Sequence, residues 1–201
     1  MEQIAEDPGN SAGFQIAVRH IKKSWIGYEG TYSYNPANEN YWFYRKQYPC
    51  LGVHASSMTS CSLEQSSSVH AAANEITGDW VFSFRHGAFR PFALIGTGIL
   101  IDVPTQSYPS TSQRIWACSK ANNVCIPTPI DLPKSAYRTQ TDIRALLVYG
   151  VGWDWTLSKH FGLRFQYRGA IHKSPGLSEL LPATNQLTQD AEPMIGLYYQ
   201  F

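Results

Sequence analysis

The 201-residue chain is long enough for one domain or at most two small ones, and its 16 Lys and Arg residues against 15 Asp and Glu residues leave a net charge of +1. Charged residues make up only 15% of the chain and aromatic residues 13%, and no run approaches the roughly 18 consecutive apolar residues of a membrane helix. This composition excludes a helical membrane protein, a disordered tail and a basic nucleic-acid binder, and it indicates a β-sandwich or β-barrel.

The N-terminal segment, residues 1–12, is polar and contains the turn-forming run from Asp7 to Asn10. It has neither the basic region nor the apolar region of a signal peptide, and we expect it to form a loop. Residues 13–201 carry the regular patterning described next and are expected to form one domain.

From Phe14 onward, apolar side chains recur at every second residue, which is the period of a β-strand with one apolar face. The pattern is clearest in Phe161–His172, and it is absent from Arg90–Val103, which is apolar on both faces and whose sides we therefore cannot assign. No convincing helical period occurs. Seven strands are predicted, at Phe14–Ile21, Trp25–Tyr34, Val69–Arg85, Arg90–Val103, Ile143–Leu157, Phe161–His172 and the last eleven residues, 191–201.

The connections between these strands alternate in length. Short turns on one side and long polar loops on the other are the layout of an outer-membrane β-barrel. The short turns are Lys22–Ser24, His86–Phe89 and Ser158–His160, and the long segments are Asn35–Ser68, Pro104–Gln140 and Lys173–Gln189.

Aromatic residues gather where the strands meet the short turns, as they would in the aromatic girdle at a membrane interface. These residues are Trp25, Phe82, Phe84, Phe89, Trp155, Phe161, Tyr199 and Phe201.

The polar face of the strands carries charges of both signs, which suits a narrow barrel interior in which each charge needs a partner. A soluble lipocalin-like barrel has the reverse arrangement, with its apolar face around a ligand, and it is the alternative. The predicted interior ionic network consists of Arg19, Glu29, Glu75, Asp79, Arg85, Arg144, Asp154, Arg164, Arg168 and Glu192.

Four cysteines, Cys50, Cys61, Cys118 and Cys125, lie in polar, turn-rich stretches without the Cys-x-x-Cys spacing of a zinc or redox site. Two local disulfides, Cys50–Cys61 and Cys118–Cys125, are the simplest interpretation, and they would require an oxidising compartment. Four unpaired loop thiols are the alternative.

The closing run from Met194 to Phe201 resembles the C-terminal signature of bacterial outer-membrane proteins, in which alternating apolar residues such as Leu197 and Tyr199 end in a terminal Phe. The runs 90–98 and 148–168 resemble the small OmpA/OmpX-like outer-membrane β-barrel domain of Gram-negative bacteria. This resemblance covers about residues 13–201. It implies an eight-stranded antiparallel up-and-down transmembrane β-barrel in contact with outer-membrane lipids, inserted by the BAM machinery, which reads the final strand; we expect a monomer.

An antiparallel barrel of this type has an even number of strands, whereas the chain shows seven. The first interpretation is that the first strand and a signal peptide lie upstream of Met1. The second is that Tyr41–Tyr48 forms the eighth strand after a turn at Pro36–Asn40, although Lys46 would then face the lipid.

One candidate catalytic set is present: His172 and Ser174 on one face, with Glu179 five residues further on. Outer-membrane lipid hydrolases use such a set, with the His activating the Ser and the carboxylate orienting the His. Here, however, the pair belongs to the polar face, away from lipid, so a strand-end His beside a loop Ser is the preferred interpretation and no enzyme activity is expected. The histidines have no metal-ligand spacing, and no metal or cofactor is expected.

The sequence therefore predicts an outer-membrane protein with a structural, adhesion or surface-interaction role, containing at most a narrow pore. Surface partners would bind through the loops at 35–68 and 104–140.

Overall fold

The computed structural model describes residues 2–23, 25–48, 58–84, 87–119, 125–130, 138–177 and 186–199. These residues form ten β-strands in one antiparallel sheet, which confirms the predicted all-β class. The described part of the chain has no helix with the length and apolar character needed to cross a membrane. The strands are β1 (Glu2–Pro8), β2 (Phe14–Lys23), β3 (Ile26–Tyr48), β4 (Met58–Ser83), β5 (Phe89–Pro104), β6 (Ser110–Ser119), β7 (Cys125–Ile130), β8 (Asp142–Thr156), β9 (Phe161–Lys173) and β10 (Leu187–Tyr199).

All seven predicted strands are present, and they follow one another across the sheet as β2, β3, β4, β5, β8, β9 and β10. Each of these strands pairs antiparallel with the next one in the series. The β6–β7 hairpin lies between β5 and β8 in the sequence but not in this part of the sheet. The predicted short turns join β2 to β3, β4 to β5 and β8 to β9. Gly87, in the β4–β5 turn, has a φ of +58°, a conformation that glycine adopts without strain.

The two faces of the sheet differ as the alternation predicts. Along β8, Leu147, Val151 and Trp153 are exposed on the outer face, whereas Val148 and Asp154 are buried on the inner face. On β5, where the sequence does not distinguish the faces, the even-numbered residues from Phe92 to Asp102 point inward. The outer surface is thus apolar, and the inner surface carries both charged and apolar side chains.

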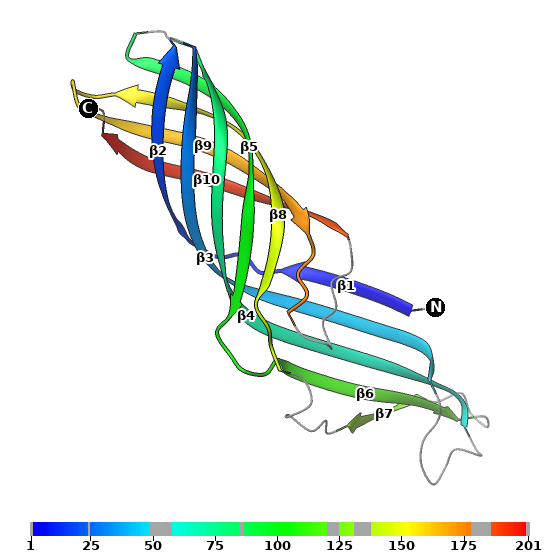
Figure 1. Ribbon diagram of the computed structural model, residues 1–201. Coiled ribbons are helices and arrows are strands. Elements are labelled where there is room, and N and C mark those ends of the chain that lie inside the picture. The colour runs from blue at the N-terminus through cyan, green and yellow to red at the C-terminus, as the bar shows by residue number, and fades with distance from the viewer. Residues whose placement is uncertain are drawn as a thin grey trace.

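The sheet is strongly curved. Arg164 on β9 donates a hydrogen bond to Glu29 on β3 at 2.9 Å, although these strands are four positions apart in the sheet, which would be about 19 Å if it were flat. The inner face of β9 therefore lies opposite the inner face of β3. In Figure 1, β9 and β10 run at a steep angle to β2, β3 and β4.

The strands are also tilted. Direct strand pairing leads from Arg19 on β2 across β3, β4 and β5 to Val148 on β8. Arg19 nevertheless bonds to Asp154, which lies six residues further along β8. If Arg19 and Asp154 lie at the same height along the axis of the curved sheet, an offset of about 20 Å along the strands accompanies a separation of about 19 Å across them. This ratio corresponds to a strand tilt of about 45°.

Beyond this curved part, the sheet continues as a narrower extension (Figure 1). Here β1 pairs with the second half of β3, the first half of β4 pairs with β6, and β6 pairs with β7. Much of the predicted loops 35–68 and 104–140 is therefore strand.

Two predictions about this extension are wrong. Residues 2–8, expected to be a loop, form β1 because the second half of β3 offers them a free edge. Residues 36–40, considered as a turn, lie inside the continuous strand β3, so Tyr41–Tyr48 extends that strand instead of forming an additional one.

Candidate functional site: the ionic interior

The inner face carries three groups of charged side chains, stacked from the short turns toward the long connections. The turn-side group contains Arg19, Glu29, Asp154 and Arg164. Glu29 accepts hydrogen bonds from Arg19 at 2.6 Å and from Arg164 at 2.9 Å, and Asp154 accepts bonds from the same two arginines at 3.1 and 2.7 Å. Two arginines and two carboxylates on four different strands therefore form a closed ring of ion pairs.

Aromatic side chains support the turn-side group. The Arg19 guanidinium lies 4.2 Å from the centre of the Phe92 ring, and that of Arg164 lies 5.3 Å from it, both in the range of cation–π contacts. Gly152, on the neighbouring strand, leaves the space that this ring fills, because a Cβ there would lie 2.7 Å from the Phe92 ring. Gly152 thus serves packing.

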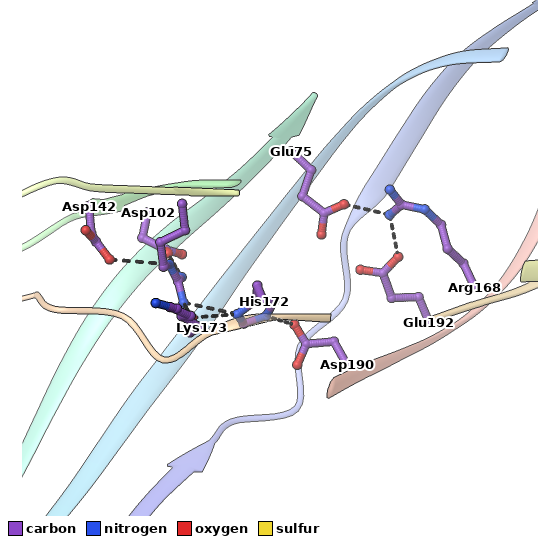
Figure 2. Close-up of polar contacts among 9 residues, drawn as sticks. Glu75, Asp102, Asp142, Arg168, His172, Lys173, Asp190 and Glu192 are labelled. Atoms are coloured by element: carbon purple, nitrogen blue, oxygen red, sulfur yellow. Dashed lines mark hydrogen bonds and ion pairs between the residues drawn. The ribbon is translucent and has the colours of Figure 1, made fainter. Parts of the chain in front are cut away.

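The central group contains Arg168, Glu75, Glu192 and Asp79. A single nitrogen of Arg168, Nη1, donates to Glu75 at 2.6 Å and to Glu192 at 2.8 Å (Figure 2). Asp79 accepts hydrogen bonds from Thr77 at 3.0 Å and from Thr31 at 3.4 Å. Two carboxylates therefore pair with one guanidinium, and Asp79 is linked to it through Thr77, to which Arg168 donates at 3.4 Å.

The loop-side group contains Arg144, Asp102, Asp142, His172 and Asp190. Arg144 forms ion pairs with Asp102 and Asp142, and it also donates to the Lys173 carbonyl. His172 contacts Asp190 through Nε2 at 2.7 Å, and its Nδ1 lies 2.9 Å from the Lys173 carbonyl (Figure 2).

The segment Ser174–Leu177, which follows β9, crosses the inner side of the curved sheet next to the loop-side group. Leu177 is buried against Val69 and Ala71 on β4, three strand positions away from β9, which the segment follows. Asp142 and Gln140 hold the segment through hydrogen bonds with the backbone of Gly176. The three ionic groups and this segment all lie on the inner side of the curved sheet.

The structure brings together nine of the ten residues predicted for the interior network. Arg85 lies outside the described residues. Asp102 and Asp190 also belong to the interior network but were not predicted. Asp190 lies two residues before Glu192 and therefore shares its inward face, which is the signal that identifies it, whereas Asp102 lies on β5, where the sequence does not distinguish the faces.

Of the candidate catalytic set, the structure describes His172 and Ser174. Both ring nitrogens of His172 are engaged, Nε2 with Asp190 and Nδ1 with the Lys173 carbonyl and Arg144. Ser174 is fully buried, and Glu179 lies outside the described residues. Within the described ranges, no three or more His, Cys, Asp or Glu side chains come together in a way that could hold a metal ion.

Two of the three predicted assembly residues lie on the edge strand β10. Leu197 and Tyr199 are both exposed on its outer face, and Phe201 lies outside the described residues.

Three of the four cysteines belong to strands of the extension. Cys118 and Cys125 are Cα partners in the β6–β7 pair, and such partners lie about 4.5–5.5 Å apart, which a disulfide can span. Cys61, on β4, is the partner of Ala117, the residue before Cys118. Cys50 lies outside the described residues.

We predict that the oxidised protein contains a Cys118–Cys125 disulfide. Trypsin cuts after Lys120, between the two cysteines, so the two resulting peptides should remain joined until a reductant is added, as mass spectrometry of the digest can show. A disulfide from Cys118 to the peptide that contains Cys50 and Cys61 would contradict this pairing.

Comparisons of the chain with protein-family models, with curated proteins and with solved structures gave no match.

Proposed function

We propose that this chain is an integral outer-membrane β-barrel protein of the OmpA/OmpX-like type, with a filled interior and a non-enzymatic role. The observation that carries the proposal is the reversed distribution of side chains. Arg168 and Glu29 are fully buried inside the curved sheet, whereas Val151 and Leu197 are exposed on its outer face. Water favours the opposite arrangement, and lipid favours this one.

The dimensions of the outer apolar face fit a membrane. Along β8, outward apolar residues extend from Ile143 to Trp155, which is about 40 Å along the strand and about 28 Å along the barrel axis at a tilt of about 45°. An outer-membrane barrel has an apolar band about 25 Å tall. At the short-turn end, rings pack in pairs such as Phe161 with Tyr199, as expected for an interfacial girdle.

We propose that the barrel closes with eight strands. Six antiparallel pairings separate β2 from β10, so the two edge strands run in the same direction. One strand of opposite direction between them would make every pairing antiparallel. A tilt of about 45° is at the upper end of the range that closed barrels show.

The membrane proposal can be tested with two single-tryptophan variants in vesicles of lipids brominated on their acyl chains. One variant keeps Trp153, on the outer face of β8, and the other keeps Trp116, which bonds to Glu64 in the extension. We expect bromine to quench Trp153 strongly and Trp116 only weakly. Equal quenching of the two variants would contradict insertion of the curved part into the membrane.

The biological role proposed here is envelope structure, adhesion or surface interaction. The extension, formed by β1, β6, β7 and parts of β3 and β4, projects from the long-connection end of the curved sheet (Figure 1). With that end outside the cell, segments 35–68 and 104–140 would present this extension to surface partners. Assembly by the BAM machinery through β10 and a monomeric state belong to the same proposal.

We predict that the protein forms no wide pore, because three ionic groups and the segment Ser174–Leu177 fill the interior. Planar-bilayer recordings should show at most small, brief current steps. Large, steady steps with passage of uncharged solutes would contradict a filled interior.

A further inference from the structure

The three short turns lie side by side at one end of the curved sheet (upper left in Figure 1). The backbone N–H of Ser83 donates to the carbonyl of Trp25 at 2.8 Å, and that of Thr156 donates to the carbonyl of Ala88 at 2.8 Å. The β2–β3 turn therefore lies next to the β4–β5 turn, which lies next to the β8–β9 turn. We call the outer surface of this end the short-turn rim; it is formed by the described residues within 19–30, 78–95, 150–164 and 195–199.

The exposed charge of the short-turn rim is positive. Its exposed basic side chains are those of His20, Lys22, Lys23, Lys159 and His160. The carboxylates described at this end are those of Glu29, Asp79 and Asp154, and all three are buried on the inner face. Because the whole chain carries a net charge of only +1, this positive surface is a local feature and not a consequence of a basic composition.

Exposed aromatic rings lie among these basic residues and connect the rim to the apolar outer face. Trp25, two residues after Lys23, is 54% exposed. From β8 into the following turn, Trp153, Trp155 and Leu157 are all exposed, and Lys159 comes next in this alternating series. At a membrane interface, indole rings favour the level of the headgroups, and lysine stems lie along apolar surface while their ammonium groups reach the headgroups.

We propose that the short-turn rim binds the headgroups of anionic phospholipids, whose phosphate groups pair with Lys22, Lys23 and Lys159. The inference rests on the proposed function, because lipid headgroups surround the rim only if the curved sheet spans a membrane. Clustered lysines are attracted to an anionic lipid surface. The short turns of outer-membrane barrels lie on the periplasmic side, so the rim selects lipids of the periplasmic leaflet.

A phospholipid fits the rim better than a soluble anion. Exposed lysines in water pair only weakly with a small anion, because water and salt screen the charges. A phospholipid adds a second contact, since its acyl chains lie along the apolar face next to Leu157 and Phe161, which are 57% exposed. An anionic headgroup also fits better than a zwitterionic one, whose own positive charge the lysines repel.

The test measures which lipid lies next to the rim. A variant that keeps Trp25 as its only tryptophan is inserted into equimolar vesicles of phosphatidylglycerol and phosphatidylcholine. In one set only the phosphatidylglycerol carries brominated acyl chains, and in the other only the phosphatidylcholine does. We expect the quenching to give a local ratio of phosphatidylglycerol to phosphatidylcholine at least about threefold above that of the vesicle. A second variant, which keeps only Trp155, gives an independent reading beside the β8–β9 turn.

Two sets of charge substitutions locate the effect. Lys22→Gln/Lys23→Gln/Lys159→Gln should return the local lipid ratio to that of the vesicle. The control Arg114→Gln/Arg138→Gln/Lys173→Gln removes as many exposed positive charges outside the rim and should leave the enrichment unchanged.

Two results would contradict the inference in different ways. Equal quenching in the two vesicle sets, even if the rim bound inorganic polyphosphate added to the buffer, would overturn the inference and leave membrane insertion intact. The same conclusion would follow if both triple variants lost the enrichment equally. Absence of quenching in both sets would overturn the proposed function and this inference together.

Discussion

Replacing Arg168 by methionine is expected to destabilise the folded protein by about 3–5 kcal/mol, because it leaves buried carboxylates without their counter-ion. Arg168 is 1% exposed and is the described ion partner of both Glu75 and Glu192. The loss should appear as a lower urea midpoint for unfolding from micelles, followed by tryptophan fluorescence.

The control for this prediction removes Arg168 together with the two carboxylates that are paired with it. In the triple variant Arg168→Met/Glu75→Gln/Glu192→Gln, neither glutamine carries the negative charge that Arg168 neutralised. Most of the lost stability should therefore return. A destabilisation of less than about 1 kcal/mol for Arg168→Met alone would show that the central group is well hydrated and that the interior is not filled.

Replacing Val151 by arginine is expected to destabilise the protein in a lipid bilayer by about 2–4 kcal/mol, the cost of a basic residue on the lipid face near the midplane. Val151 lies near the middle of β8 and is exposed on the outer face. If the outer face were in water instead, Val151→Arg at this exposed position would change the free energy of unfolding by no more than about 0.5 kcal/mol. Urea unfolding from vesicles measures the difference.

A matched substitution in the extension separates the lipid effect from a general effect of added charge. Ser112, on β6, is also exposed, so Ser112→Arg adds the same side chain outside the proposed membrane region. It should change the free energy of unfolding by no more than about 0.5 kcal/mol. If both variants lose the same stability, the outer face of β8 does not contact lipid.

The alternation of the sequence was sufficient to predict the strands and faces of the curved sheet. In Phe161–His172, for example, each second residue is apolar, and the structure exposes Phe161 and Tyr167 while burying Arg168 and His172. It was insufficient for β5, because Phe92 and Leu94 on the inner face are as apolar as Ile95 on the outer face. The apolar inner cluster of β5 and β8 explains this exception.

The extension could not be predicted in the same way. The first half of β4 includes the serine-rich run Ser66–Ser68, and β7 contains Pro127 and Pro129, so neither shows an apolar face or strong β propensity. These segments are strands because neighbouring strands continue past the curved sheet and offer hydrogen-bonding edges. That is a tertiary effect, which periodicity does not record.

The identity of the ion pairs was also beyond the sequence. Charges on the inner face were predictable one by one, but Arg19 bonds to Asp154 across the interior only because the strands are tilted. Which residues meet across a curved sheet depends on this offset. A one-residue change of register would exchange the inner and outer faces of a strand.

The central claim, that the apolar outer face contacts lipid, is tested most directly by refolding the chain in parallel in detergent micelles and in plain buffer. Far-ultraviolet circular dichroism and gel migration without boiling would follow both samples. The account predicts a β-sheet spectrum with heat-modifiable migration only in micelles. A stable, monomeric β fold in plain buffer would contradict it, because the exposed apolar face would then have to tolerate water.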